Sequence, residues 1–278
     1  MSKVSIRNAI RFSFSFLFRN FAAIAVRIAL PSLFGWLAFY VSLVLYLTEL
    51  IRYLGNPSDR IAGLVLGLAT AGLLVTLFLH SVIVASVTAL ALGLEDGGWK
   101  YFHVARREWR LYAANLRLLL VTVIWSAVVQ AVQFAAVRFS WPGFVDQILD
   151  LLMLGGMVLL TVRVWFLLAP VSVANNHGEI LRRAWRLSSE NLWHLAAIVF
   201  VLLLAGLVVE VAGEMVLRIS GALPPFPITG SLANYAVVYR AILPYVLVVI
   251  GIAYIVGNVL LTAARVYVYR QLTEKTEP

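Results

Sequence analysis

The stretch "RREWRLYAANL" at residues 106–116 returns almost unchanged as "RRAWRLSSENL" at residues 182–192. Both copies read Arg-Arg-x-Trp-Arg-Leu-x-x-x-Asn-Leu, and each leads directly into a long apolar run. A more divergent third copy, "IRFSFSFLFRNF", occupies residues 10–21 and aligns with the others on its asparagine. Repetition of this kind is common among membrane proteins built from duplicated units. The sequence therefore predicts three related units.

The composition places the chain in lipid. Of its 278 residues, 62% are hydrophobic and only 13% are charged, whereas soluble domains are about 45–50% apolar and about 25% charged. A bilayer core about 30 Å thick is crossed by about 20 helical residues. Backbone groups in lipid must be satisfied internally, which favours helices. Six apolar runs are long enough, near residues 22–47, 62–93, 115–137, 148–174, 192–217 and 240–266.

These observations predict an all-α membrane protein with six transmembrane helices arranged as three duplicated hairpins. We expect one transmembrane domain over residues 1–278, with repeat units of roughly 1–98, 99–176 and 177–278. Each hairpin is preceded by one copy of the repeated stretch, which we expect to form an amphipathic helix in the membrane interface. The shared asparagines Asn20, Asn115 and Asn191 are expected to mark the bend into each span and to cap the new helix.

Arginines beside aromatic rings suit the membrane interface, because the rings lie at headgroup level and guanidinium groups meet phosphates. The residues expected to face lipid headgroups are Arg106, Arg107, Trp109, Arg110, Arg182, Arg183, Trp185 and Arg186. One interpretation treats these segments only as topological anchors. The other treats them as a cytoplasmic collar that binds headgroups or a protein partner. The sequence leaves both open.

The basic residues also predict the orientation of the chain. Most Lys and Arg residues fall in segments on the side of the N-terminus, whereas the opposite side carries Arg52, Arg60, Arg138, Arg218 and Arg240. Under the positive-inside rule both termini are cytoplasmic. We expect a multi-pass protein of the bacterial inner membrane. The net charge is +9, and the basic residues behind it lie in segments next to the spans. We therefore do not expect nucleic acid as a partner.

Polar side chains at bilayer depth are costly and are candidate functional residues. Arg163 is the clearest, and His80, Gln130, Gln133 and Asn258 are expected within its reach as ligand-binding residues. Each has a structural alternative. His80 can be a packed, hydrogen-bonded residue, and the three amides can join helices. Arg163 itself can pair with Glu210 or with backbone carbonyls.

Signatures of enzyme chemistry are missing from the sequence. There is no Cys, no phosphate-binding loop and no nucleophile elbow, and no metal-ligand spacing. We therefore predict a protein that is not an enzyme and has no metal and no cofactor. Glu214 and Arg218, four residues apart, are expected to pair. The proline-rich segment 220–230 is read as a stiff link, with a lid as the alternative.

The run from Arg163 to Leu195, "RVWFLLAPVSVANNHGEILRRAWRLSSENLWHL", resembles a bacterial family of six-helix integral membrane proteins, some of them fused to glycerophosphodiester phosphodiesterase domains. The matching positions are Leu181, Arg182, Arg183, Trp185, Leu187 and Asn191. Ala184 stands where the family has Ser, and Glu190 where it has Gly. The resemblance implies the six-helix fold and no particular activity.

Two functions are predicted. The first is a non-enzymatic membrane protein that binds lipid headgroups or a partner, in membrane homeostasis or assembly. Its partners are anionic membrane lipids and either another protein or a second copy of the chain. The alternative is a small transporter for an anionic or amphiphilic solute, with Arg163 in its path. Few acidic residues are available in the spans for ion coupling, which counts against the second.

Overall fold

The computed structural model describes residues 4–56, 58–94, 106–139, 141–142, 144–174, 179–221 and 232–274, and no strand occurs within them. The proline-rich segment read as a link lies almost wholly outside these residues. The helices in chain order are α1 (Ile6–Arg19), α2 (Phe21–Gly55), α3 (Asp59–Leu92), α4 (Arg106–Arg138), α5 (Phe144–Leu160), a π-helical turn η1 (Thr161–Trp165), α6 (Phe166–Ala174), α7 (Ile180–Ser188), α8 (Leu192–Ile219) and α9 (Leu232–Thr273).

Six helices are long and apolar enough to cross a membrane, as the sequence predicts. They cover Pro31–Leu54, Arg60–Leu92, Arg106–Ala136, Gln147–Ala174, Leu192–Ile219 and Gly251–Thr273. The fourth runs continuously through α5, η1 and α6, because a π-helical turn keeps the backbone hydrogen-bonded. The chain is therefore an all-helical, multi-pass membrane protein by the length and composition of its helices.

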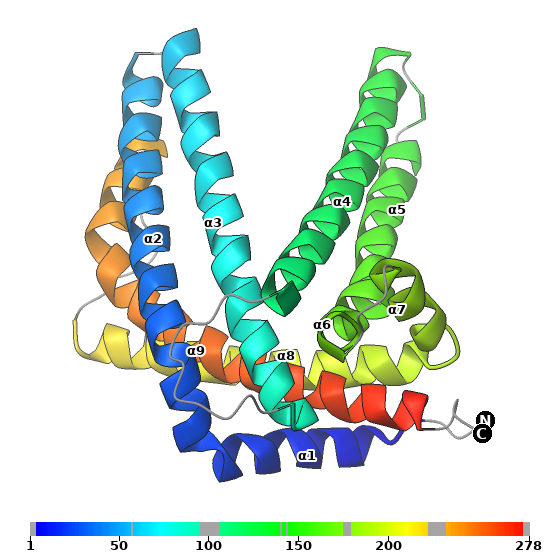
Figure 1. Ribbon diagram of the computed structural model, residues 1–278. Helices are drawn as coiled ribbons and strands as arrows, with labels where there is room; N and C mark the ends of the chain where they lie inside the picture. The colour runs from blue at the N-terminus through cyan, green and yellow to red at the C-terminus, as the bar shows by residue number, and fades with distance from the viewer. Residues whose placement is uncertain are drawn as a thin grey trace.

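The six apolar helices do not form three equivalent hairpins. Figure 1 shows α2–α3 and α4–α5 as two upright pairs that diverge from a common base, whereas α8 runs crosswise at that base. The end of α9 also lies along the base, beside α1. α9 is 42 residues long and contains Pro244, which lacks the amide N–H that a straight helix uses. The third pair thus departs from the geometry of the first two.

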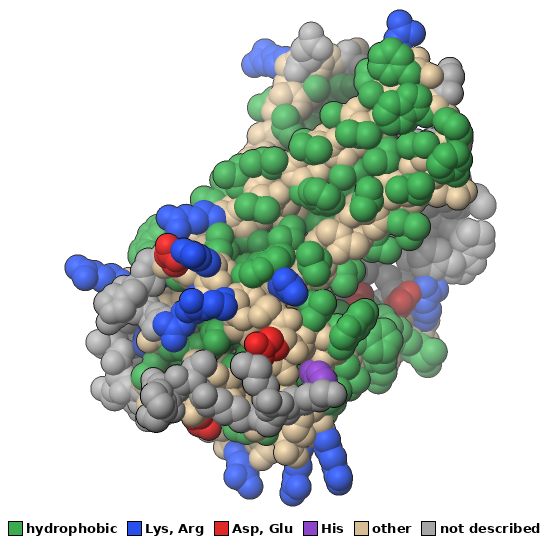
Figure 2. Space-filling view, turned by 90° about the vertical axis from the view of Figure 1, so that its right-hand side faces the viewer, with side chains coloured by type: hydrophobic (Ala, Val, Ile, Leu, Met, Phe, Trp, Pro, Cys, Tyr) green, Lys and Arg blue, Asp and Glu red, His purple; other side chains and the backbone are tan. Residues whose placement is uncertain are grey.

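The buried core lies at this base. Phe166, Leu167, Ile198 and Ala264 are fully buried there, contributed by α6, α8 and α9. The upper parts of the upright pairs are instead covered with exposed apolar side chains, and Figure 2 shows them on one face. Soluble monomers rarely expose apolar surface on this scale. The divergent pairs are therefore suited to lipid.

The repeated stretch takes two different structures. In the first copy α1 ends at Arg19 and the chain bends by 75° into the start of α2, and in the third copy α7 ends before Asn191. In the second copy, however, α4 continues without a break through Asn115. The prediction of a separate interfacial helix with a bend at Asn115 is wrong. Ala113 and Ala114 precede that asparagine, and Ala is the strongest helix former.

The three asparagines also do not cap the spans. Asn20 donates its side-chain amide back to the Phe16 carbonyl (3.0 Å) and so closes α1. Asn115 donates to Ser81 Oγ on α3 (3.0 Å). The Asn191 side-chain oxygen accepts from the Val4 backbone N–H (3.2 Å). The capping prediction is wrong, because none of the three side chains bonds to a backbone N–H in the first turn of its own span. Asn20 bonds within α1, and Asn115 and Asn191 bond to residues far away in sequence.

Candidate functional site

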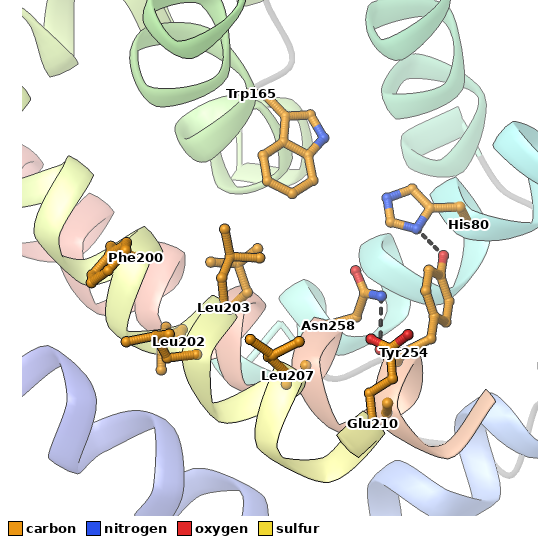
Figure 3. Close-up of a pocket in the computed structure, with 14 residues that line it drawn as sticks. His80, Trp165, Phe200, Leu202, Leu203, Leu207, Glu210, Tyr254 and Asn258 are labelled. Atoms are coloured by element: carbon orange, nitrogen blue, oxygen red, sulfur yellow. Dashed lines mark hydrogen bonds between the residues drawn. The ribbon is translucent and has the colours of Figure 1, made fainter. Parts of the chain in front are cut away.

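A cavity of about 650 Å³ lies between α3, η1, α8 and α9. Its wall is mostly apolar, with Phe200, Leu203 and Leu207 projecting from α8 (Figure 3). Glu210, also on α8, is exposed at the same cavity. The volume falls within the range of roughly 300–1,000 Å³ that is usual for small-molecule sites.

The other wall carries a connected polar group. A hydrogen bond joins His80 Nδ1 of α3 to the Tyr254 hydroxyl of α9. Asn258, one turn further along α9, donates its side-chain amide to the Tyr254 carbonyl (2.8 Å). All three residues line the cavity (Figure 3). His80 and Asn258 were both predicted as ligand-binding residues, and the structure brings them to one wall.

Arg265 is a buried cation that contacts the wall of this site through Trp165. Its side chain is 1% exposed, and Cζ lies 3.8 Å from the ring centroid of Trp165, which lines the cavity. Its Nε and one terminal nitrogen are buried with no hydrogen-bond acceptor among the described residues. A buried charge without an ionic partner costs several kcal/mol, and a desolvated cation–π contact returns about 2 kcal/mol. The stacking therefore offsets only part of the cost.

Arg163 does not occupy the position that the sequence predicts. Its Cζ lies 4.7 Å from the ring centroid of Trp185 on α7, and its buried Nε has no acceptor in the described part of the chain. Its carbonyl accepts from Ser188 Oγ (2.7 Å). The prediction assumed a regular α-helix, whereas Arg163 lies in the π-helical turn η1, which changes the face that a residue presents.

The two predicted glutamines also lie apart from the cavity. Gln130 is exposed on α4. Gln133 donates its side-chain amide to Asp150 on α5 (2.9 Å) and joins the two helices of that pair. Of the five residues expected around one ligand, the structure therefore places only His80 and Asn258 at the cavity. Of the structural alternatives for the other three, the structure shows only that of Gln133, which joins two helices. Arg163 stacks on Trp185 and pairs with neither Glu210 nor a carbonyl among the described contacts.

The sequence interpretation missed Arg265, Trp165 and Tyr254. Arg265 was counted with the cytoplasmic charges at the end of the last span. A signal was present, because it stands inside the apolar run "VLLTAARVYV" at residues 259–268. Tyr254 precedes Asn258 by one helical turn, and Trp165 follows Arg163 by two residues. Only the packing of η1 against α9 shows that these three side chains share a site.

The basic segments predicted to face headgroups are partly exposed. Arg106, Arg182 and Arg186 are exposed, and the tryptophans Trp109 and Trp185 are 54% and 38% exposed. Arg110 and Arg183 are half-buried. Arg107 is half-buried too, with Nε 2.9 Å from the buried carboxylate of Glu108. Because its guanidinium is held by Glu108, Arg107 is less available to lipid headgroups than the exposed arginines are.

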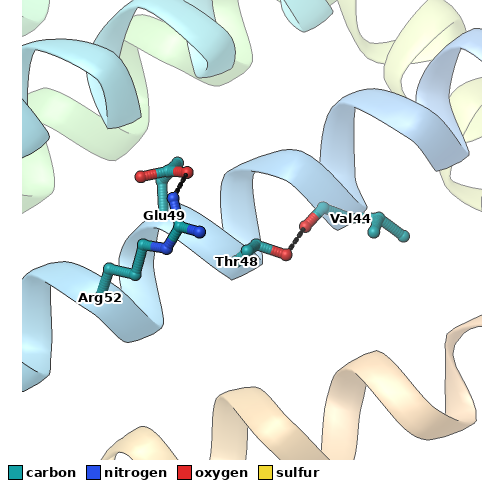
Figure 4. A network of polar contacts seen from close by, with 4 residues as sticks. All are labelled: Val44, Thr48, Glu49 and Arg52. Carbon is teal, nitrogen blue, oxygen red and sulfur yellow. Dashed lines mark hydrogen bonds and ion pairs between the residues drawn. The ribbon is translucent and has the colours of Figure 1, made fainter.

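Arginines in the last turns of α2 and α8 pair with acidic side chains. Arg52 lies 2.7 Å from Glu49 near the end of α2, beside the Thr48 hydroxyl that donates to the Val44 carbonyl (Figure 4). The predicted pair of Glu214 and Arg218 is confirmed at 2.5 Å. The pair on α2 neutralises positive charge away from α1 and α7, whereas the pair on α8 lies at the base, where α8 runs crosswise (Figure 1). No group of three or more His, Asp or Glu residues suited to a metal occurs in the residues that the structure describes.

Comparison of the chain with protein-family models, curated proteins and solved structures found no match. The resemblance of residues 163–195 to a six-helix family therefore stays a prediction.

Proposed function

We propose that this chain is a non-enzymatic membrane protein that binds anionic lipid headgroups through its basic end. That end consists of α1, the start of α4 and α7. One observation carries the proposal: the three copies of the repeated stretch lie in the same, lower half of the molecule, although they are far apart in sequence (Figure 1). A hydrogen bond from the Val4 N–H to Asn191 Oδ1 ties the first copy to the third.

The chemistry of this end suits a phosphate-bearing surface. The exposed guanidiniums of Arg106, Arg182 and Arg186 can each bind a phosphate through two parallel hydrogen bonds. Each basic residue close to an anionic leaflet contributes about 1 kcal/mol. The exposed rings of Trp109 and Trp185 are amphipathic and favour the headgroup level. We assign this end to the cytoplasmic leaflet on the charge distribution.

The test compares equal charge losses at the two ends. One variant carries Arg182→Gln, Arg183→Gln and Arg186→Gln, and its control carries Arg52→Gln, Arg60→Gln and Arg138→Gln. Both are reconstituted in nanodiscs of mixed phosphatidylglycerol and phosphatidylcholine, and the lipids retained on the protein are counted by native mass spectrometry. We expect the first variant to lose its enrichment in phosphatidylglycerol and the control to keep it. Equal losses would show that net charge, and not this end, attracts the lipid.

A second candidate function is transport of an anionic amphiphile. The observation that favours it is that three cavities share walls. His80 and Tyr254 line both the 650 Å³ cavity and a cavity of about 200 Å³ against α2. Trp165 lines both the 650 Å³ cavity and one of about 330 Å³ against α4 and α5. Movement of these side chains would join the cavities into one path across the base.

Transport is tested in proteoliposomes with a fluorescent anionic lipid placed in the outer leaflet. A transporter moves the probe inward faster than protein-free vesicles do, and dithionite quenching of the outer leaflet measures the rate. Rates equal to those of protein-free vesicles leave headgroup binding as the function.

A further inference from the structure

We propose that the 650 Å³ cavity binds an amphiphile that has one apolar chain and an anionic head group, with Arg265 as the positive partner of that head. This site goes beyond headgroup binding at the basic end, since it uses α3, η1, α8 and α9 and none of the exposed arginines.

The apolar wall suits a single chain. Phe200, Leu203 and Leu207 of α8 line one side (Figure 3). Two glycines widen the space, Gly206 on α8 and Gly257 on α9. A Cβ atom added at either would meet no atom within 4 Å. Phe200, Leu203 and Leu207 are each more than half exposed, so a bound apolar chain would cover apolar surface that the structure leaves open.

The buried charge calls for an anion. Arg265 keeps its positive charge in protein interiors, because the guanidinium is not deprotonated there. Its Nε and one terminal nitrogen have no acceptor in the part of the chain that the structure describes. The face of Trp165 offsets part of the cost of burying the charge and accepts a hydrogen bond from none of the N–H donors. A carboxylate or phosphate offers two acceptor oxygens in the geometry of the guanidinium fork.

Trp165 supplies a route to that charge. Its ring lines the 650 Å³ cavity and also the 330 Å³ cavity bounded by Leu118, Thr122 and Met157. The second cavity has room for the indole when it turns away from Arg265. Trp165 is the last residue of the π-helical turn η1, a feature that frequently occurs at functional sites. With the indole turned away, the guanidinium is no longer covered on this side, and an anion that enters from the 650 Å³ cavity can reach Nε and the terminal nitrogen at the edge of the group.

The other polar residues fix where the head lies. His80, Tyr254 and Asn258 form one wall, where Nε2 of His80 and the second amide hydrogen of Asn258 are left to bond further head-group oxygens. The carboxylate of Glu210 lines the cavity from α8 and repels an anion. The head therefore lies toward Trp165, and the chain extends along the leucines of α8.

The experiment titrates three probes into the full-length, delipidated protein in mild detergent, with binding measured by native mass spectrometry and calorimetry. Oleate and lysophosphatidylglycerol, each with one chain, are the anionic probes, and oleyl alcohol has the same chain as oleate without the charge. Arg265→Gln removes the charge. Gly206→Leu fills the chain site and also raises helix propensity, so it keeps the fold. Arg163→Gln is the matched control, because Arg163 also stacks on a tryptophan but lies away from the cavity.

We expect Arg265→Gln to bind the preferred anionic probe roughly 10- to 100-fold more weakly, the range of a lost charged hydrogen bond, and to bind oleyl alcohol as wild type does. Gly206→Leu should lose both, and Arg163→Gln neither. Tighter binding of oleate identifies a carboxylate head as the ligand group, and tighter binding of lysophosphatidylglycerol identifies a phosphate head. Either result supports the site.

The proposal is overturned if neither anionic probe binds the wild type, or if Arg265→Gln binds both as wild type does. Should Arg265→Gln fail to fold, unchanged binding by Gly206→Leu overturns it instead. The variant with Arg182, Arg183 and Arg186 replaced should bind oleate normally. Its behaviour separates this site from the basic end, since each can fail without the other.

Discussion

Arg265 stacks on Trp165 with its Cζ 3.8 Å from the ring centroid, and Arg163, two residues before that tryptophan, stacks on Trp185 at 4.7 Å. Arg163 and Trp165 both belong to the π-helical turn η1. Arg163 contacts α7, whereas Trp165 contacts Arg265 of α9. Arg265 is fully buried, whereas Arg163 is only half-buried. The free-energy cost of the charge is therefore larger at Arg265 than at Arg163.

Replacement of Arg265 by Leu should leave the thermal midpoint unchanged or raise it. The substitution removes a buried charge that has no carboxylate partner among the described residues, and exchange of buried charges for apolar residues is often stabilising, by about 1–4 kcal/mol. Trp165→Ala should instead lower stability by about 3–5 kcal/mol, because it opens a cavity and removes the stacking. Thermal unfolding in detergent, followed by circular dichroism, measures both. A large loss in Arg265→Leu would assign Arg265 a structural role.

Asn191→Ala should loosen the start of α1. The Val4 N–H is buried and donates to Asn191 Oδ1 (3.2 Å), and a buried donor without an acceptor costs about 1–3 kcal/mol. Hydrogen exchange of the peptide that contains Val4 should become faster. Asn20→Ala is the control, since its amide bonds within α1 and leaves Val4 untouched. Equal exchange in the two variants would count against this tie between the first and third copies.

The six apolar helices were predictable from the sequence because each depends only on length and composition. His80 and Asn258 were predictable as cavity residues because polar groups stand out in apolar runs. The crosswise course of α8 was not predictable from the sequence, because it depends on how the helices pack. The continuity of α4 was missed because the helix propensity of Ala113 and Ala114 outweighs the expected bend at Asn115. Arg265 was missed because position near the end of a span suggested an interfacial charge, whereas packing buries it.

The predicted topology places both termini in the cytoplasm. In the structure α1 begins and α9 ends at the same end of the molecule (Figure 1). Alkaline phosphatase and green fluorescent protein fusions at residue 278 and within residues 220–230 test the orientation. We expect the terminal fusion to fluoresce and the loop fusion to show phosphatase activity. The same reporter active at both positions would contradict the assignment.

The adjacent glycines of α5 should respond in opposite ways to alanine. A Cβ atom at Gly156 would lie 2.6 Å from Trp125 Nε1 on α4, whereas one at Gly155 would meet nothing within 4 Å. Gly156→Ala must displace the indole, and such overpacking costs about 1–3 kcal/mol. Gly155→Ala should be neutral or stabilising by up to about 1 kcal/mol, the difference in helix propensity.

Urea or thermal unfolding of the two variants in one detergent gives the comparison, because both substitutions change the unfolded chain in the same way. Tryptophan fluorescence supplies a second readout, since only Gly156→Ala moves the Trp125 ring. Equal stabilities with unchanged emission would mean that α4 and α5 do not approach each other at this point. A selective loss in Gly156→Ala locates the close contact that holds the α4–α5 pair together, while the rest of its apolar surface stays available to lipid.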